Sequence, residues 1–282
     1  MNYDHLFHAG NFADVVKHII LVRIITYLQR KPAAFRVIDT HAGAGIYDLA
    51  SERARKNPEW EMGIARLLAN PPGGEAGRLV APYLDLIEAM NDGELSEYPG
   101  SPLIARRLLR PHDRLSVMEL HPDAAAALKG LLGGDAHVKV MELDGYAALP
   151  AQLPPKEKRG LVLVDPPFEE AGEFDRLVGL LVKAHRHFPT GAYALWYPLK
   201  DEAATVAFKR HFFQTGISAI LSSELWLRAP SVPPRLFGTG MIVVNPPFVL
   251  KDELDHIFAA LVPIFSDARS AGFRNEWIRP AP

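Results

Sequence analysis

The eight residues 161–168, LVLVDPPF, constrain the fold of this chain more than any other stretch. Four apolar residues run straight into Asp165, two prolines and Phe168. The apolar run is short and lacks polar alternation, which predicts a strand buried on both faces of a parallel sheet. The prolines end the strand because neither can donate to a sheet ladder. We therefore expect Asp165 at the carboxyl end of a central strand, the edge where open α/β sheets bind ligands.

A carboxylate beside an aromatic ring suits a flat base that carries an exocyclic amine. Asp165 would accept hydrogen bonds from the amine, and Phe168 would stack on the base. The alternative is an Asx turn with a buried Phe that closes the strand. Short motifs also occur by chance, so this tetrapeptide alone leaves both interpretations open.

Composition limits the class of protein. The 282 residues fit one large α/β domain or two small ones, and 48% hydrophobic residues support a sizeable core. The absence of cysteine excludes disulfides, thiolate nucleophiles and cysteine metal sites. A net charge of −2 means that nucleic acid could be bound only by local basic patches. The chain has no apolar run of membrane-spanning length and no visible secretory signal, so we expect a cytoplasmic protein with no membrane contact.

The first part of the chain predicts a helix, a strand and a glycine turn. Apolar residues at helical spacing predict a helix to about residue 29, capped by Asn11 or Asp14, with its charged residues facing away from the apolar stripe. Residues 35–39 then form a strand that leads into the turn 41–45, which includes His41 and Gly43. A helix after this turn would offer free N–H groups to a ligand. The turn fits NAD, S-adenosylmethionine or no ligand, because Asp48 stands in place of a third glycine.

Two later strands end in acidic residues. The strand 115–120 reaches Glu119, which could bind ribose hydroxyls, and the strand 138–143 leads into Asp144 and Gly145. Asp144 could accept the amine of a bound adenine, or it could serve only a turn. Further strands are predicted at 192–198, 217–227 and 240–248, with helices at about 122–132, 171–187, 201–214 and 251–264. The tail beyond 264 is left unassigned.

Residues 50–98 do not fit an alternating α/β unit, and they predict a helical insertion after the first strand-helix unit of a single domain, residues 1–282. Ser101 follows as the expected N-cap of a helix with Pro102 at its first position. This structural role is sufficient to explain a serine there.

A second motif, Asn245-Pro246-Pro247-Phe248, rivals the first. The two strands around residues 228–240 are joined without a helix, which predicts an antiparallel pair. Asn245 would then lie at the far edge of the sheet, as a structural strand stop. The connecting loop starts at the edge where Asp165 lies, so Arg228 and Arg235 are candidate substrate contacts or solvated loop residues.

The motifs together resemble the bacterial 23S ribosomal RNA adenine-N6 methyltransferases of the RlmJ type, which are class I S-adenosylmethionine-dependent enzymes. The resemblance covers nearly the whole chain, and the stretches that carry it are 8–18, 39–45, 98–106, 119–122, 165–168 and 193–198. It implies a Rossmann-like α/β fold with a seven-stranded, mostly parallel sheet whose seventh strand is antiparallel. It also implies methyl transfer to the N6 of an adenine in 23S rRNA.

The resemblance further implies roles for individual residues. Asp165, Pro166 and Phe168 would act on the target base, and Tyr3, Lys17 and Phe168 would contact the RNA. The cofactor would be held by His18, His41, Gly43, Ser101, Glu119, Asp144, Gly145 and Asp165. Phe168 replaces the usual tyrosine, which keeps stacking and loses any hydroxyl contact. We expect a monomer without a metal ion; a DNA adenine-N6 methyltransferase is the alternative.

Overall fold

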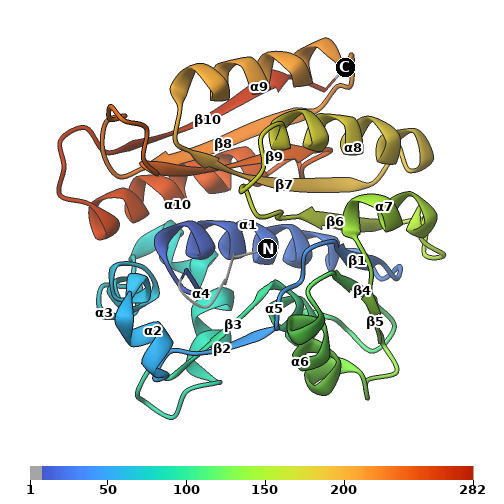
Figure 1. Ribbon diagram of the computed structural model, residues 1–282, viewed down its shortest axis with the longest axis horizontal. Helices are drawn as coiled ribbons and strands as arrows, with labels where there is room; N and C mark the ends of the chain where they lie inside the picture. The colour runs from blue at the N-terminus through green and yellow to red at the C-terminus, as the bar shows by residue number, and fades with distance from the viewer. Residues whose placement is uncertain (1–7, 282) are drawn as a thin grey trace.

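The computed structural model describes residues 8–281, and the predicted RNA contact Tyr3 lies outside them. Its central feature is one eight-stranded sheet in the order β10-β8-β9-β7-β6-β1-β4-β5 (Figure 1). The strands of this sheet are β1 (Arg36–Asp39), β4 (Arg114–Glu119), β5 (Val138–Glu142), β6 (Gly160–Val164), β7 (Ala192–Leu199), β8 (Ile220–Trp226), β9 (Gly238–Val244) and β10 (Gly272–Arg279).

The sheet is mostly parallel, as predicted. Strand β1 pairs in parallel with β4 and β6, and β5 and β7 extend the parallel part on either side. Strand β9, the seventh of the predicted strands, lies antiparallel between β7 and β8, which confirms the expectation drawn from its helix-free connection. The sheet has one strand more than the seven predicted. The C-terminal residues form β10, which pairs antiparallel with β8 at the edge of the sheet.

Helices cover both faces of the sheet (Figure 1). One face packs against α1 (Phe12–Leu28), α5 (Ser101–Leu108), α6 (Pro122–Leu132) and α10 (Leu250–Phe265). The other packs against α8 (Glu173–His187) and α9 (Glu202–Gln214), with α7 (Gly145–Ala148) and the 3₁₀ turn η3 (Leu149–Gln152) beside them. Strand β6 is buried along its whole length, as its apolar run predicts.

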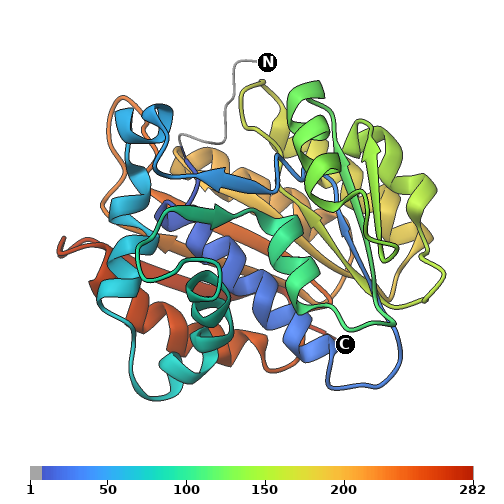
Figure 2. The ribbon, with the colours of Figure 1, turned by 90° about the horizontal axis from the view of Figure 1, so that it is seen from below.

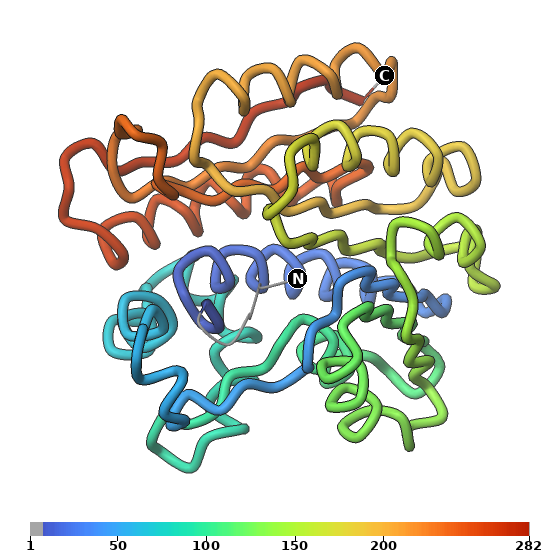
Figure 3. The backbone as a smooth tube through the Cα atoms, viewed as in Figure 1, coloured from blue at the N-terminus to red at the C-terminus, as the bar shows by residue number. Residues whose placement is uncertain are grey.

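Helix α1 runs across the middle of the molecule (Figure 3). Asn11 is its N-cap, and the Asn11 side chain accepts from the backbone N–H groups of Ala13 and Asp14, each at 2.9 Å. Every residue from Ala13 to Ile25 is buried, as expected of a helix packed on all sides. The prediction that the charged residues of this helix face away from the apolar stripe is wrong for Lys17 and Arg23, which are buried and paired with carboxylates.

The connection from β1 to β4 is long and contains its own small sheet. Strands β2 (Ile46–Asp48) and β3 (Glu97–Pro99) pair antiparallel, side by side in Figure 2. Between them lie α2 (Glu52–Lys56), the 3₁₀ turn η2 (Glu59–Met62), α3 (Ile64–Ala69) and α4 (Gly74–Glu88). The pairing of β2 with β3 returns the chain to its starting point, where the N–H of Gly100 donates to the carbonyl of Gly45 at 2.9 Å.

A strand of the small sheet, and not a helix, follows the glycine turn. The sequence predicted a helix directly after residues 41–45, but β2 comes next instead. Helix α5 begins beside the turn only after the chain has returned through β3, so a helix N-terminus still reaches the predicted place. The N-cap of α5 is Gly100, which corrects the prediction of Ser101 in that role. No described helix is long and apolar enough to cross a membrane.

Candidate active site

A cleft of about 820 Å³ opens at the carboxyl ends of the parallel strands. It is lined by residues that the sequence had singled out on separate segments. They are Lys17, His18, His41, Gly43, Ser101, Glu119, Asp144, Gly145, Asp165 and Pro166. The parallel arrangement of β1, β4, β5 and β6 brings together those that follow the strands, because strands that run in one direction end at one edge. Lys17 and His18 come from α1, and Ser101 comes from the start of α5.

The glycine turn and Glu119 are joined directly. The N–H of Gly43 donates to one carboxylate oxygen of Glu119 at 2.8 Å, and the N–H of His121 donates to the other at 2.7 Å. Gly43 has a φ of 63°, and a Cβ there would lie 2.3 Å from the Tyr47 hydroxyl oxygen. The turn therefore needs glycine at this position. These two backbone donors fix the orientation of the Glu119 carboxylate at the end of β4.

Asp144 and Gly145 lie at the connection between the end of β5 and the start of α7. Asp144 caps α7 by accepting from the N–H of Tyr146 at 2.8 Å, so its turn role holds, and the residue also lines the cleft. A Cβ on Gly145 would lie 2.1 Å from the carbonyl oxygen of Thr40, so only glycine fits between β5 and the end of β1. The Tyr146 ring stands edge-on to the His41 ring, with centroids 5.1 Å apart.

Asp39, Ser101 and His41 form a buried polar group at the end of β1. The Ser101 hydroxyl donates to Asp39 Oδ2 at 2.7 Å, and the His41 backbone N–H donates to Oδ1 at 3.2 Å. Burial raises the pKa of Asp39 to about 6, against the lowering effect of these hydrogen bonds. Burial also lowers the pKa of His41 to about 4, so its imidazole is neutral at pH 7.

His18 begins a chain of buried hydrogen bonds behind the cleft. Its Nδ1 lies 2.7 Å from the Tyr98 hydroxyl, which lies 2.9 Å from the hydroxyl of Tyr83. The His18 and Tyr98 rings are also stacked, with centroids 5.6 Å apart. Because His18 stands next to the apolar stripe of α1, the residue pattern alone predicts a half-buried histidine, but only 1% of His18 is exposed. Because Tyr83 and Tyr98 come from α4 and β3, this chain ties residues 50–98 to the wall of the cleft.

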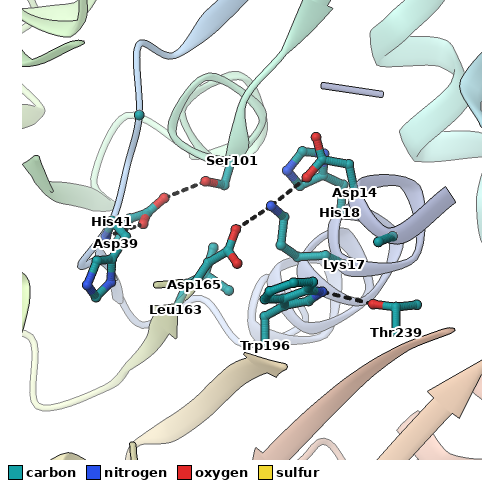
Figure 4. Close-up of polar contacts among 12 residues, drawn as sticks. Asp14, Lys17, His18, Asp39, His41, Ser101, Leu163, Asp165, Trp196 and Thr239 are labelled. Carbon is teal, nitrogen blue, oxygen red and sulfur yellow. Dashed lines mark hydrogen bonds and ion pairs between the residues drawn. The ribbon is translucent and has the colours of Figure 1, made fainter. Parts of the chain in front are cut away.

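Lys17 lies between two carboxylates (Figure 4). Its ammonium donates to Asp14 Oδ1 at 2.6 Å and also to Asp165 Oδ2. The side chains of Lys17, Asp14 and Asp165 are only 4%, 5% and 13% exposed. Burial alone would lower the pKa of Lys17, but the two carboxylates outweigh it and raise that pKa well above its ordinary value. The lysine is therefore charged, and it fixes the Asp165 side chain at the rim of β6.

A second cavity of about 220 Å³ adjoins the first. Phe168, Trp196 and Pro198 supply its aromatic and apolar wall. The two cavities share Lys17, Asp165, Pro166, Pro167 and Glu169, so they meet at the Asp-Pro-Pro turn. The Phe168 ring stands edge-on to Trp196, with centroids 5.6 Å apart. Trp196 Nε1 donates to the Thr239 hydroxyl at 2.8 Å, as Figure 4 shows.

The rival motif lies at the opposite edge of the sheet. The Asn245 amide donates to the carbonyl oxygens of Pro189 at 2.9 Å and Gly191 at 2.8 Å, just before β7 begins. This is the position predicted from the antiparallel course of β9. Asn245 has a φ of 50°, a conformation that asparagine tolerates better than most residues.

Sequence reasoning did not assign a role to three residues of the site. Asp39 and Trp196 were named only within the stretches 39–45 and 193–198 that carry the resemblance. Tyr146 follows Asp144 and Gly145 directly, and its position in that motif was the available signal. Among residues 8–281, no group of three or more His, Cys, Asp or Glu side chains is arranged to hold a metal ion.

The sheet is mostly parallel, with the antiparallel strand β9 between β7 and β8, and the cleft lies at the carboxyl ends of the parallel strands. This combination defines a class I methyltransferase. The family model described as ribosomal RNA large subunit methyltransferase D, RlmJ, matches residues 32–279. The chain belongs to this RlmJ family of ribosomal RNA large subunit methyltransferases.

Individual relatives agree over the full length. The protein named ribosomal RNA large subunit methyltransferase J in Haemophilus influenzae is 39% identical over 282 residues, 99% of either chain. Its Escherichia coli namesake is 38% identical over 284 residues, also 99% of either chain. The crystal structure of protein LPL1258 from Legionella pneumophila is 35% identical and superposes with a TM-score of 0.87, covering 96% of this chain and 98% of that one.

Proposed function

We propose that this enzyme transfers a methyl group from S-adenosylmethionine to the exocyclic N6 of an adenine in 23S ribosomal RNA. The observation that carries the proposal is the position of Asp165, at the junction of the two cavities. A carboxylate there can face a methyl donor on one side and a nucleobase on the other. We infer the class of RNA from the names of the relatives. From the Asp-Pro-Pro-Phe turn we infer that an amine accepts the methyl group.

The larger cleft suits the cofactor in volume and in the chemistry of its lining. The Glu119 carboxylate is suited to ribose hydroxyls, since acids at this strand end bind them in nucleotide-binding folds. Asp144 can accept from the adenine amine while it caps α7. Gly43 and Gly145 leave room at the turn and at the β5 end. The side chains of Ser101, His41 and His18 complete the wall. When bound, this cofactor supplies an electrophilic methyl group on a sulfonium.

The smaller cavity suits the target adenine. Phe168 would stack on the base, a contact worth about 1–3 kcal/mol. Lys17 uses Asp165 Oδ2, so we propose Oδ1 and the Pro166 carbonyl as the acceptors for the two amine hydrogens. An adenine amine is a poor nucleophile because its lone pair is delocalised into the ring. Two acceptors favour a pyramidal nitrogen whose lone pair points toward the larger cleft, and such positioning contributes up to about 7–11 kcal/mol.

The base must leave a helix or come from an unpaired segment to enter a cavity this small. We propose that residues 50–98 form an insertion subdomain that helps to shape this entrance. The N–H of Ile64 donates to the carbonyl of Gly10 at 2.9 Å, and Glu59 accepts from the Asn11 amide at 2.9 Å. These contacts hold the start of α1 beside the second cavity. We further propose that the enzyme acts in the cytoplasm as a monomer.

Methylation assays on two nucleic acids test the proposed function. Purified enzyme and S-adenosylmethionine are incubated with protein-free 23S rRNA from cells that lack the enzyme, and in parallel with duplex DNA. Mass spectrometry of the digested nucleosides should find one additional N6-methyladenosine per rRNA molecule and none in the DNA. Methylation of DNA alone would support the DNA adenine methyltransferase, and methylation of neither would overturn the proposal.

A further inference from the structure

The loop 228–237 between β8 and β9 lies at the same edge of the sheet as the two cavities. Its sequence, RAPSVPPRLF, contains two arginines and no acidic residue. Residues 228–235 are all exposed, and Val232 is 100% exposed, so the tip of the loop adds nothing to the core. A loop of this kind is better explained by contact with a partner than by folding.

The base of the loop is fixed to the smaller cavity. The N–H of Phe237 donates to the carbonyl of Leu199 at 2.9 Å, which holds the loop beside the end of β7. Arg228 Nη2 donates to the carbonyl of Leu236 at 2.7 Å, and Leu236 lines the cavity. Lys200, also exposed, lines it from the end of β7. Lys200 and Arg228 therefore lie at one side of the proposed base pocket, and Arg235 directly precedes the lining residue Leu236 in the chain.

The larger cleft has the opposite electrostatic character. Seven carboxylates line it, against three lysines and arginines. A cleft of this composition favours a cationic ligand and repels phosphates. An RNA strand whose base enters the smaller cavity would therefore keep its backbone away from the cofactor cleft and follow the side where Lys200 and the loop lie.

We propose that Lys200, Arg228 and Arg235 form a basic ridge that binds phosphates of the ribosomal RNA strand on either side of the target adenine. This inference rests on the proposed function and assigns the strand a path across the enzyme. Arginine and lysine are the side chains that most often contact phosphate. The bond from Arg228 to Leu236 uses one guanidinium nitrogen and leaves further donors for a phosphate oxygen.

The ridge is tested by the salt dependence of RNA binding. Fluorescence anisotropy with a labelled single-stranded fragment of 23S rRNA gives the Kd at several salt concentrations, without any turnover. For single strands each phosphate contact contributes about 0.7 to the slope of log K against log salt. Arg228→Gln/Arg235→Gln should raise the Kd about tenfold and reduce the slope by about 1.4, while calorimetry shows an unchanged Kd for S-adenosylmethionine.

The matched control is Arg107→Gln/Arg186→Gln. Both arginines are exposed, near the ends of α5 and α8 at the opposite edge of the sheet, so the change in net charge is the same. This variant should bind RNA as the wild type does. Replacing Arg228 can move the loop, because it removes the bond to Leu236. Arg235→Gln alone leaves that bond in place and should still reduce the slope by about 0.7.

The outcomes separate the ridge from the proposed function. If the wild type methylates rRNA and the loop variants keep the wild-type Kd for RNA and its salt dependence, the proposal of a basic ridge is wrong. The proposed function then stands. If the loop variants lose affinity only for assembled ribosomal particles and not for naked RNA, the loop binds protein and the ridge is wrong. Equal losses in the loop variant and the control would also overturn the ridge, since they would reflect net charge alone.

Discussion

Lys17 and Asp165 are 148 residues apart in the chain, yet the ammonium of one donates to the carboxylate of the other at the rim of the site. The same ammonium binds Asp14, so two buried carboxylates share one cation. The arrangement links the first helix of the protein to the turn that ends its central strand. It fixes the side chain on which the proposed chemistry depends.

Replacing Lys17 with methionine should therefore affect both stability and activity. The change leaves Asp14 and Asp165 buried without their cation, which costs about 3–5 kcal/mol in such pairs. The pair raises the pKa of Lys17 above its ordinary value of 10.5, so its contribution is fully present at pH 7 and is lost only above that value. Urea denaturation at pH 7 should show the loss, together with reduced methylation.

A second substitution distinguishes the two effects. In Lys17→Met/Asp14→Asn one of the two carboxylates is neutral, so part of the stability lost in the single variant should return. Methylation should stay low, because Asp165 is still no longer held in place. Recovery of full activity together with stability would contradict a positioning role for Lys17.

Thr239 should control RNA binding through Trp196. Thr239→Val removes the acceptor of the indole N–H, and the indole stands against the Phe168 ring in the proposed base pocket. We expect a KM for rRNA raised several-fold, a loss of about 1 kcal/mol in stability and an unchanged affinity for S-adenosylmethionine. Thr239→Ser restores a hydroxyl and should restore the KM. A similar KM in the valine and serine variants would argue against this role.

Asp39 should make stability depend on pH. Its pKa is about 6 in the folded protein, against an ordinary value of 3.8 that applies once the chain unfolds, so the protonated form favours folding. The contribution is fully present below pH 3.8 and is lost as pH rises through 6, by up to about 3 kcal/mol. Asp39→Asn should remove this dependence. Urea denaturation at pH 4.5 and 7.5 should therefore show the variant gaining stability relative to the wild type at the higher pH.

Asn245 should matter for stability and not for catalysis. Asn245→Ala removes both hydrogen bonds to the start of β7 and places alanine at a φ of 50°. We expect a loss of about 1–3 kcal/mol in the free energy of unfolding and near-normal methylation. Asn245→Gly tolerates this φ and should lose less stability. A folded alanine variant without activity would mean that the wrong Pro-Pro-Phe motif was chosen.

Features carried by local sequence could be predicted, and features that depend on distant partners could not. The burial of β6 and its end at Asp165 follow from an apolar run and two prolines, and the direction of β9 follows from a helix-free loop. Strand β10 was missed because its sequence, GFRNEWIR, has neither a continuous apolar run nor a regular alternation of apolar and polar residues. The burial of Lys17 was missed because one of the two carboxylates that compensate its charge, Asp165, comes from the turn after β6.

Only part of the proposed site could be predicted from the sequence. The acids at the ends of β4 and β5 could be placed because parallel strands share an edge. The helix beside the glycine turn was misplaced, since nothing local shows that β2 and β3 pair and return the chain to Gly45. The junction of the two cavities depends on packing between α1, β6 and β7, which no single motif encodes.

The most direct test of the central claim measures methyl transfer and cofactor binding in Asp165→Ala and Asp165→Asn. Both variants should fold and bind S-adenosylmethionine, while transfer to rRNA falls by a factor on the order of 10² or more, because the amine loses its charged acceptor. A folded Asp165→Ala variant that methylates 23S rRNA at a near-wild-type rate would contradict the account.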